Sequence, residues 1–120
     1  MASIVVIDED GPIRALLAEW LIAAGYKVKA LSPLDSCGGL SADLVLLDLP
    51  RLRQQGREHV RRVQAAFLGA VMIGLSTQLA ANLPAYSALV QDMGLRGLLA
   101  KPASRDELLA AVAQALETGR

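Results

Sequence analysis

Short apolar runs recur five times along this sequence, with longer segments between them. They lie at residues 3–7, 26–31, 44–47, 70–75 and 95–100. Most are rich in Val, Ile and Leu, as expected of strands buried on both faces of a parallel sheet. The fifth run is interrupted by Gly97, and the second alternates loosely between apolar and polar residues. The pattern predicts five strands.

Helical periodicity marks most of the segments between these runs. The first segment has apolar residues at the spacing of one helical stripe, followed by the stop signal Gly25: Ile13, Leu16, Leu17, Trp20, Leu21 and Ala24. A second stripe consists of Val60, Val63 and Phe67, with arginines between them.

Capping signals predict where the last two helices begin. Asn82-Leu83-Pro84 offers a helix cap with proline in the first turn, so we expect a helix from there to Gly94. It would carry Tyr86, Leu89, Val90 and Met93. Ser104 to Glu107 has the form of a capping box ahead of a last apolar stripe.

The connection between the second and third strands departs from this alternation. It contains Pro33, Gly38 and Gly39, and about one helical turn would fit there, so we expect a degenerate helix or a loop. The whole pattern predicts an α/β fold. Its form would be a flavodoxin-like, doubly wound sheet of five parallel strands in the order 2-1-3-4-5, with helices on both faces and a shortened second helix.

Length and composition limit the class of protein. The 120 residues fit one domain, residues 1–120, and 53% of them are hydrophobic with a formal net charge of +0. This balance predicts a soluble domain with no overall attraction to nucleic acid or to anionic membranes. No membrane-length apolar run or signal peptide is evident, and the single Cys37 suits a reducing compartment, so we expect a cytoplasmic location.

Polar residues follow the predicted strands at the points where the strands end. Asp8, Glu9 and Asp10 follow the first strand, Asp48 the third, Ser76 and Thr77 the fourth, and Lys101 the fifth. The carboxyl ends of parallel strands meet at one edge, where such folds bind ligands. Acids, a hydroxyl and an amine gathered there could hold a divalent cation and contact a phosphoryl group.

These segments, in this order, resemble the receiver domains of two-component response regulators, of the chemotaxis-regulator type. The resemblance covers nearly the whole chain and rests on five pieces: VVIDEDGPIR at 5–14, DLVLLDLP at 43–50, Gly56, GLS at 74–76 and AKP at 100–102.

The resemblance implies a role for each matching residue. Asp48 would be the nucleophile that accepts a phosphoryl group from a phosphohistidine, with Ser76 and Lys101 contacting that group. Mg²⁺ would be held by Asp8, Glu9, Asp48 and the backbone carbonyl of Pro50. Cation and amine together would screen the charge that develops during transfer. The domain would be a phosphoacceptor rather than an enzyme.

The sequence also departs from the family pattern. Glu9 stands where aspartate is usual, Thr77 where alanine or glycine is preferred, and Leu98 where a switching aromatic residue is common. Pro50 and Leu52 replace the usual pattern after the phosphoacceptor, and the segment from Ser76 to Lys101 is longer than usual. These differences place metal affinity and aromatic-coupled switching in doubt.

Two other functions are compatible with the residues. The first is a pseudo-receiver, a binding module that works without phosphorylation. The second is a phosphatase of the haloacid dehalogenase type, in which Asp8 would be the nucleophile and Asp10 the general acid. The absence of a later acidic pair at a strand end and the short chain oppose the phosphatase.

The resemblance implies partners as well. A sensor histidine kinase or phosphotransfer protein would supply the phosphoryl group. An output domain or downstream protein would bind the face of the fourth helix, fifth strand and fifth helix, where Tyr86, Leu95 and Leu98 could repack. A homodimer, a stand-alone regulator and a fragment of a longer one all remain open.

Three further features are interpreted as structural: His59 as a surface residue, Cys37 as a loop or packing thiol, and the arginines at 51, 53, 57, 61 and 62 as a solvated helix face.

Overall fold

A computed structural model of the chain describes residues 1–118. It contains one sheet of five parallel strands in the order β2-β1-β3-β4-β5. The strands are β1 (Ser3–Ile7), β2 (Lys27–Leu31), β3 (Leu44–Asp48), β4 (Val71–Ser76) and β5 (Gly97–Ala100). The predicted flavodoxin-like strand order is confirmed, and the strand boundaries lie within two residues of those expected from the sequence.

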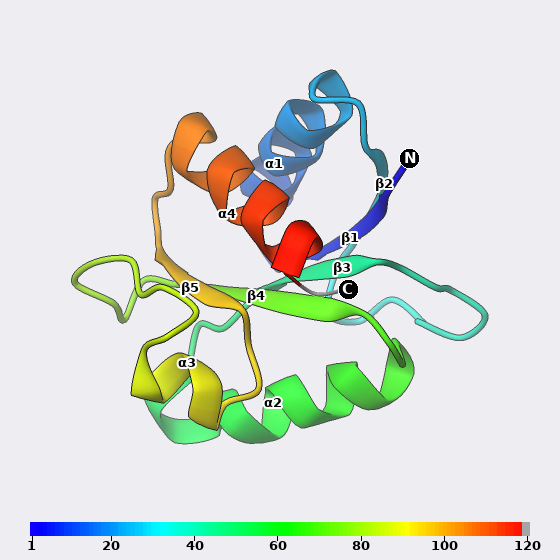
Figure 1. Ribbon diagram of the computed structural model, residues 1–120. Coiled ribbons are helices and arrows are strands. Elements are labelled where there is room, and N and C mark those ends of the chain that lie inside the picture. The colour runs from blue at the N-terminus through cyan, green and yellow to red at the C-terminus, as the bar shows by residue number, and fades with distance from the viewer. Residues whose placement is uncertain (119–120) are drawn as a thin grey trace.

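Four helices cover the two faces of the sheet (Figure 1). They are α1 (Gly11–Ala23), α2 (Leu52–Ala66), α3 (Ala88–Asp92) and α4 (Arg105–Thr118). Figure 1 shows α1 and α4 on one face and α2 and α3 on the other. Within residues 1–118, no helix is long and apolar enough to cross a membrane.

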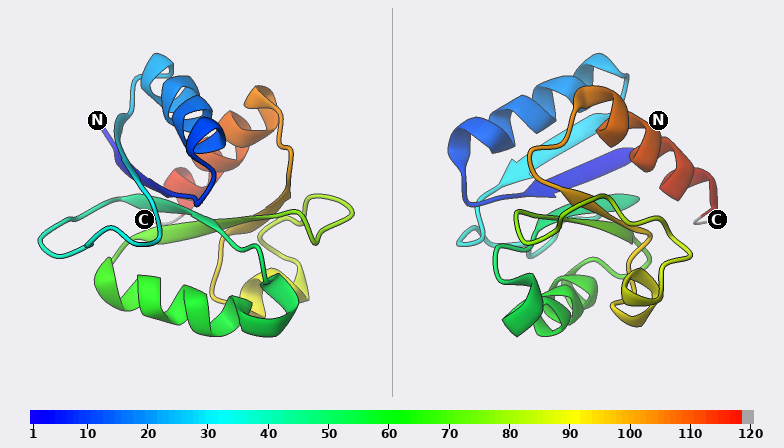
Figure 2. Two further views of the ribbon diagram at one scale, coloured as in Figure 1. Left: turned by 180° about the vertical axis from the view of Figure 1, so that it is seen from behind. Right: turned by 90° about the vertical axis from the view of Figure 1, so that its left-hand side faces the viewer.

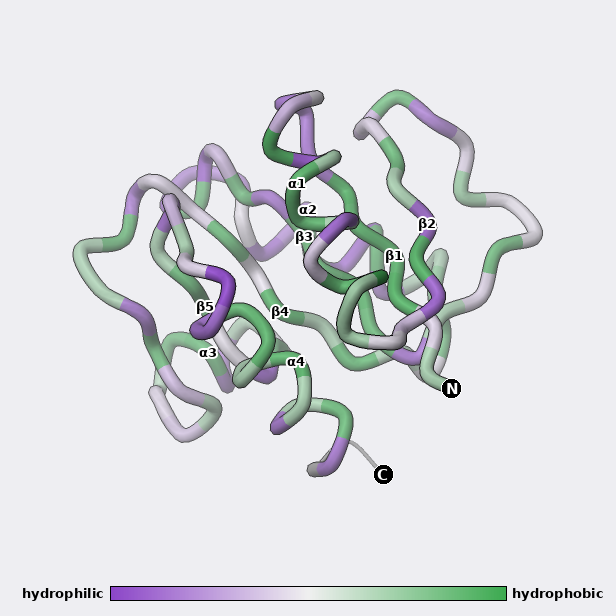
Figure 3. The backbone as a smooth tube through the Cα atoms, turned by 90° about the horizontal axis from the view of Figure 1, so that it is seen from above, coloured by the Kyte–Doolittle hydropathy of each residue, from purple (hydrophilic) through white to green (hydrophobic). Residues whose placement is uncertain are grey.

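Strand alternation divides the core into two layers. On β1, Ile4 and Val6 belong to the apolar cluster that packs with α1 and α4, whereas Val5 and Ile7 belong to the cluster on the other face. This follows from the period of two in a strand. The three inner strands are therefore apolar along their length, while the edge strand β2 carries hydrophilic stretches, as Figure 3 shows. Exposed lysines on β2 discourage pairing with another chain.

The expected shortened second helix is not present. Residues 32–43, between β2 and β3, form turns, bends and irregular backbone, and Figure 2 shows this connection as a long loop without a coiled ribbon. Gly39 has a φ of +78°, a conformation that interrupts a right-handed helix. Leu40 and Ala42 pack against the core cluster from this loop. The prediction of a short helix was therefore wrong, and the alternative of a loop was right.

The helix predicted to begin at Asn82 is also shorter than expected. α3 begins at Ala88, after the N-cap Ser87. Asn82 does not cap it, because its side-chain oxygen accepts a hydrogen bond from the backbone N–H of Ala100 at 2.7 Å. Leu83 forms an antiparallel bridge with Leu98. The segment thus lies along the open edge of β5 instead of starting a helix.

Candidate functional site

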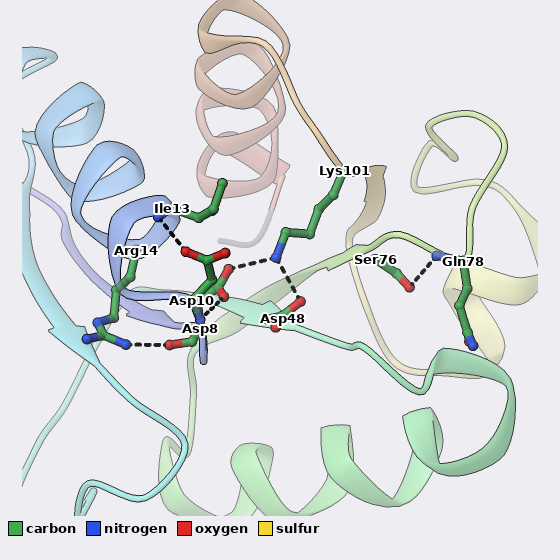
Figure 4. A network of polar contacts seen from close by, with 8 residues as sticks. All are labelled: Asp8, Asp10, Ile13, Arg14, Asp48, Ser76, Gln78 and Lys101. Carbon is green, nitrogen blue, oxygen red and sulfur yellow. Dashed lines mark hydrogen bonds and ion pairs between the residues drawn. The ribbon is translucent and has the colours of Figure 1, made fainter.

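The carboxyl ends of the strands bring three charged side chains together (Figure 4). Asp8 follows β1, Asp48 is the last residue of β3, and Lys101 follows β5. The Lys101 ammonium donates to Asp8 Oδ2 at 3.0 Å and to Asp48 Oδ1 at 3.1 Å. The three residues predicted to converge from separate strands are therefore in direct contact.

Asp8 is fixed by contacts from the loop and helix that follow it. Its Oδ1 accepts a hydrogen bond from the backbone N–H of Asp10 at 2.9 Å. The Arg14 guanidinium donates to the Asp8 backbone carbonyl at 2.7 Å. Asp10 caps α1, since its Oδ1 accepts from the N–H of Ile13 at 3.1 Å. Both carboxylate oxygens of Asp8 are thus occupied.

Asp48 differs from Asp8 because only one of its oxygens is occupied. Oδ1 contacts Lys101, but no hydrogen bond from residues 1–118 reaches Oδ2. No buried side-chain oxygen in that range lacks a partner, so Oδ2 is in contact with solvent. The side chain borders a cavity of about 530 Å³. Asp48 therefore has one anchored oxygen and one that an incoming group can reach.

Burial and charge shift the pKa values of this cluster. Burial and the nearby Asp8 carboxylate raise the pKa of Asp48, and Lys101 only partly offsets them. Burial alone would lower the pKa of Lys101, but its hydrogen bonds to Asp8 and Asp48 outweigh burial and raise that pKa. The arrangement favours a permanently charged ammonium between two carboxylates that repel each other.

The other predicted site residues lie nearby in different settings. Ser76 is fully buried at the end of β4, and its hydroxyl accepts a hydrogen bond from the N–H of Gln78 at 3.1 Å. Glu9 and Pro50 are exposed and line the same cavity as Asp48. The Lys101–Pro102 peptide bond is cis.

A divalent cation would find only part of a complete site among these side chains. Across residues 1–118, no three His, Cys, Asp or Glu side chains are close enough together to hold a metal ion. Asp8 and Asp48 supply buried carboxylate oxygens at one point, and hard cations prefer oxygen ligands. These oxygen donors are of the kind that Mg²⁺ binds. Glu9 lies at the cavity rim and does not join Asp8 and Asp48 as a third acidic residue.

Three further residues lie in this region without having been predicted from the sequence to belong to the site. Arg14 holds the end of β1, as described above. Gln78 accepts from the N–H of Arg53 at 3.1 Å, which ties the loop after β4 to α2. His59, interpreted as a surface residue, is partly buried and lines the cavity. The sequence spacing predicts that His59 lies one helical turn from Gln55, but it does not predict that a cavity lies beside it.

Comparison with known proteins gives the fold a family context. No family model matches the sequence. A response regulator receiver domain protein (CheY-like) from Methanospirillum hungatei superposes with a TM-score of 0.75 at 19% identity, over 99% of this chain and 96% of that one. The chain has the fold of a response-regulator receiver domain. The resemblance seen in the sequence is confirmed at this level.

Two further similarities bear on this receiver fold. A Burkholderia pseudomallei response regulator, solved with a phosphorylated aspartic acid, calcium ion and citrate, gives a TM-score of 0.71 at 21% identity, over 98% of this chain and 70% of that one. The CAI-1 autoinducer sensor kinase/phosphatase CqsS of Vibrio cholerae is 32% identical over 117 residues, 92% of this chain. The chain spans only 17% of the length of CqsS.

Proposed function

We propose that this receiver domain accepts a phosphoryl group on Asp48 and thereby changes its binding to a partner. The proposal rests on the different contacts of the two carboxylate oxygens of Asp48. Lys101 holds Oδ1, while Oδ2 is in contact with solvent and the side chain borders the cavity. A carboxylate held in this way can attack phosphorus in line with its leaving group.

The phosphodonor would be the phosphohistidine of a sensor kinase or phosphotransfer protein. The P–N bond of the donor breaks as a bond forms between phosphorus and Asp48 Oδ2, and the imidazole leaves. Lys101 stabilises negative charge on the transferred group. Similarity to a sensor kinase and to a regulator solved with a phosphorylated aspartic acid supports this chemistry. The chain would thus act as a phosphoacceptor in the cytoplasm rather than as an enzyme.

Mg²⁺ is the proposed cofactor. Asp8, Asp48, Glu9 and the Pro50 carbonyl would hold it, and it would neutralise charge on the phosphoryl oxygens. The calcium ion in the Burkholderia regulator supports a divalent cation in this type of fold. The response would reach an output partner through α3, β5 and α4, next to Ser76.

The geometry makes the phosphatase alternative less suitable. It requires Asp8 as nucleophile and Asp10 as general acid, but both oxygens of Asp8 are already bonded. Asp10 is engaged in capping α1. Asp48 is the better nucleophile because its Oδ2 is free.

One observation favours the pseudo-receiver as the second candidate. Glu9 does not join Asp8 and Asp48 in a closed group of three acids, so a cation would be held less completely. Such a domain would bind partners through the same fold without being phosphorylated.

Intact mass measurement after incubation with acetyl phosphate and Mg²⁺ tests the proposal. The wild type should gain the mass of one phosphoryl group, and Asp48→Asn should not. Asp43→Asn is a matched control, because Asp43 precedes the opposite end of the same strand. A gain that persists in Asp48→Asn but disappears in Asp8→Asn would support the phosphatase. No gain in any variant would support the pseudo-receiver.

A further inference from the structure

The cavity beside Asp48 extends well beyond the phosphoacceptor residues. Its volume of about 530 Å³ lies within the range of small-molecule sites. One wall is the loop that replaces the missing second helix, through Pro33 and Cys37. The other wall is α2 and the residue that precedes it. Absence of the helix therefore leaves a space next to the site.

Hydrogen-bond donors line the α2 wall at helical spacing. They are Arg51, Gln55, His59 and Arg62, which follow one another by four, four and three residues. This spacing places them on one stripe of the helix. No side chain within residues 1–118 forms an ion pair or hydrogen bond with any of these four. By contrast, Arg57 on another side of α2 pairs with Asp92.

The two ends of the cavity differ in charge. Glu9, Asp48 and Arg51 carry charges of both signs near the strand ends, whereas Arg62 and His59 lie about two to three helical turns further along α2. His59 and Arg62 lie three residues apart on α2, and burial together with the nearby Arg62 lowers the pKa of His59. An anion bound at the second end would meet positive charge and no carboxylate among the residues lining that end. Between the ends, Leu49, Val63 and Ala66 provide apolar contact.

We propose that this cavity binds a small organic anion, with its carboxylate or phosphate group on Arg62 and His59 and a flat apolar body between α2 and the 32–43 loop. The guanidinium offers two donors in the geometry of such groups. The apolar body would gain from burial against Val63 and Ala66. The ligand would lie beside Asp48 without using it.

NMR titration of the ¹⁵N-labelled chain tests this site with three probes: 2-naphthoate, 2-naphthyl phosphate and the uncharged 2-naphthamide. We expect the two anions to shift the amide signals of residues 37, 59, 62 and 66, and 2-naphthamide to bind at least tenfold more weakly. The relative affinity of the two anions shows whether the site prefers carboxylate or phosphate. Shifts confined to other surfaces, or equal binding of all three probes, would overturn the proposal.

Neighbouring arginines provide a matched pair of variants. Arg62→Gln should weaken binding of the anions by about tenfold, because it removes a charged donor. Arg61→Gln makes the same charge change on the next residue, which lines a different groove of α2, and should leave affinity within about twofold. Equal losses of affinity in both variants would show that overall charge alone explains the effect, and would contradict a specific binding site. Since no phosphodonor is present, failure here leaves the phosphoacceptor proposal untouched.

Discussion

Lys101 is the residue on which the charge balance of the site depends. Its side chain is 13% exposed and contacts two carboxylates that are still more buried. Lys101→Met would leave these carboxylates facing each other without a cation, so we expect a loss of about 3 kcal/mol in the free energy of unfolding at neutral pH. Urea unfolding measures this loss.

A second substitution shows whether the loss comes from charge. Adding Asp8→Asn to Lys101→Met removes one of the two repelling carboxylates and should recover part of the stability. If the double variant is less stable than Lys101→Met alone, packing rather than electrostatics explains the effect. Lys101 itself should stabilise the fold fully below its ordinary pKa of 10.5, and this contribution should disappear as pH rises through its higher folded value.

Asp48 has the opposite effect on stability at neutral pH. Its folded pKa is raised above the ordinary 3.8, so the folded state keeps a proton that the unfolded chain has released. Stability therefore falls as pH rises from 3.8 through the folded pKa. Asp48→Asn should be more stable than the wild type by about 1 kcal/mol at neutral pH, because residues kept for function often lower the stability of the fold. The difference should vanish below pH 3.8 in paired urea titrations, and a less stable variant at neutral pH would contradict the prediction.

Some site residues could be predicted from the sequence, and others could not, for a physical reason. Asp48 is the last residue of its strand, and Asp8 and Lys101 directly follow theirs. The direction of each strand therefore determines where these side chains lie. Glu9 is one residue further into a loop, where no periodicity sets side-chain direction, and it lies at the rim. His59 has a fixed place on α2, but what faces it depends on a loop without regular structure.

At the scale of elements, the segment between β4 and α3 is held by contacts along the edge of β5. Asn82 accepts from Ala100 and donates to Glu107, both at 2.7 Å. Asn82→Ala should cost about 1 kcal/mol and speed amide exchange at Ala100 about fivefold. Asn82→Asp keeps the acceptor for Ala100 but faces the Glu107 carboxylate. The exchange rate at Ala100 in Asn82→Asp should lie between those of the wild type and Asn82→Ala. An unchanged exchange rate in Asn82→Ala would show that the contact contributes little.

This segment also shows why the sequence misplaced a helix start. Asn82-Leu83-Pro84 satisfies the local rules for a helix cap, and those rules consider only neighbours in sequence. β5 is an edge strand with unpaired backbone groups, and pairing with Leu83 satisfies two of them. Long-range pairing therefore prevailed over the local preference. The capping box at Ser104 and Glu107 had no such competitor, and both of its hydrogen bonds form.

Two glycines test how tightly the elements pack. A Cβ at Gly74 of β4 would lie 2.7 Å from Leu98 Cδ2 and 2.8 Å from Leu49 Cδ1, so Gly74→Ala should cost about 2 kcal/mol. At Gly56 of α2, the nearest atom is the flexible end of Met93 at 2.9 Å. Gly56→Ala should leave stability unchanged or raise it by up to about 1 kcal/mol, because alanine favours a helix. Thermal unfolding of both variants compares them, and a larger loss at Gly56 would contradict this packing account.

At the scale of the whole molecule, sheet topology determines where charge can gather. Parallel strands in the order β2-β1-β3-β4-β5 point their carboxyl ends the same way, so residues 93 positions apart in the chain meet at one edge. The apolar clusters on the two faces hold these strand ends in place, and the Asp8 and Asp48 side chains there are largely buried. Burial raises the cost of repulsion between Asp8 and Asp48, and a cation at that edge should therefore stabilise the entire fold.

Mg²⁺ binding can be measured through that global stability. A ligand that binds only the folded state at a hundred times its Kd raises the free energy of unfolding by about 2.7 kcal/mol. We expect Mg²⁺ to stabilise the wild type in urea unfolding and to have little effect on Asp8→Asn or Asp48→Asn. Glu9→Gln should lose a smaller part of the effect, because Glu9 is exposed at the cavity rim. Glu58→Gln, an exposed acid on α2, is the control and should respond like the wild type. Equal stabilisation of all four variants would mean that Mg²⁺ acts by general screening, and the proposed cation site would then have to be abandoned.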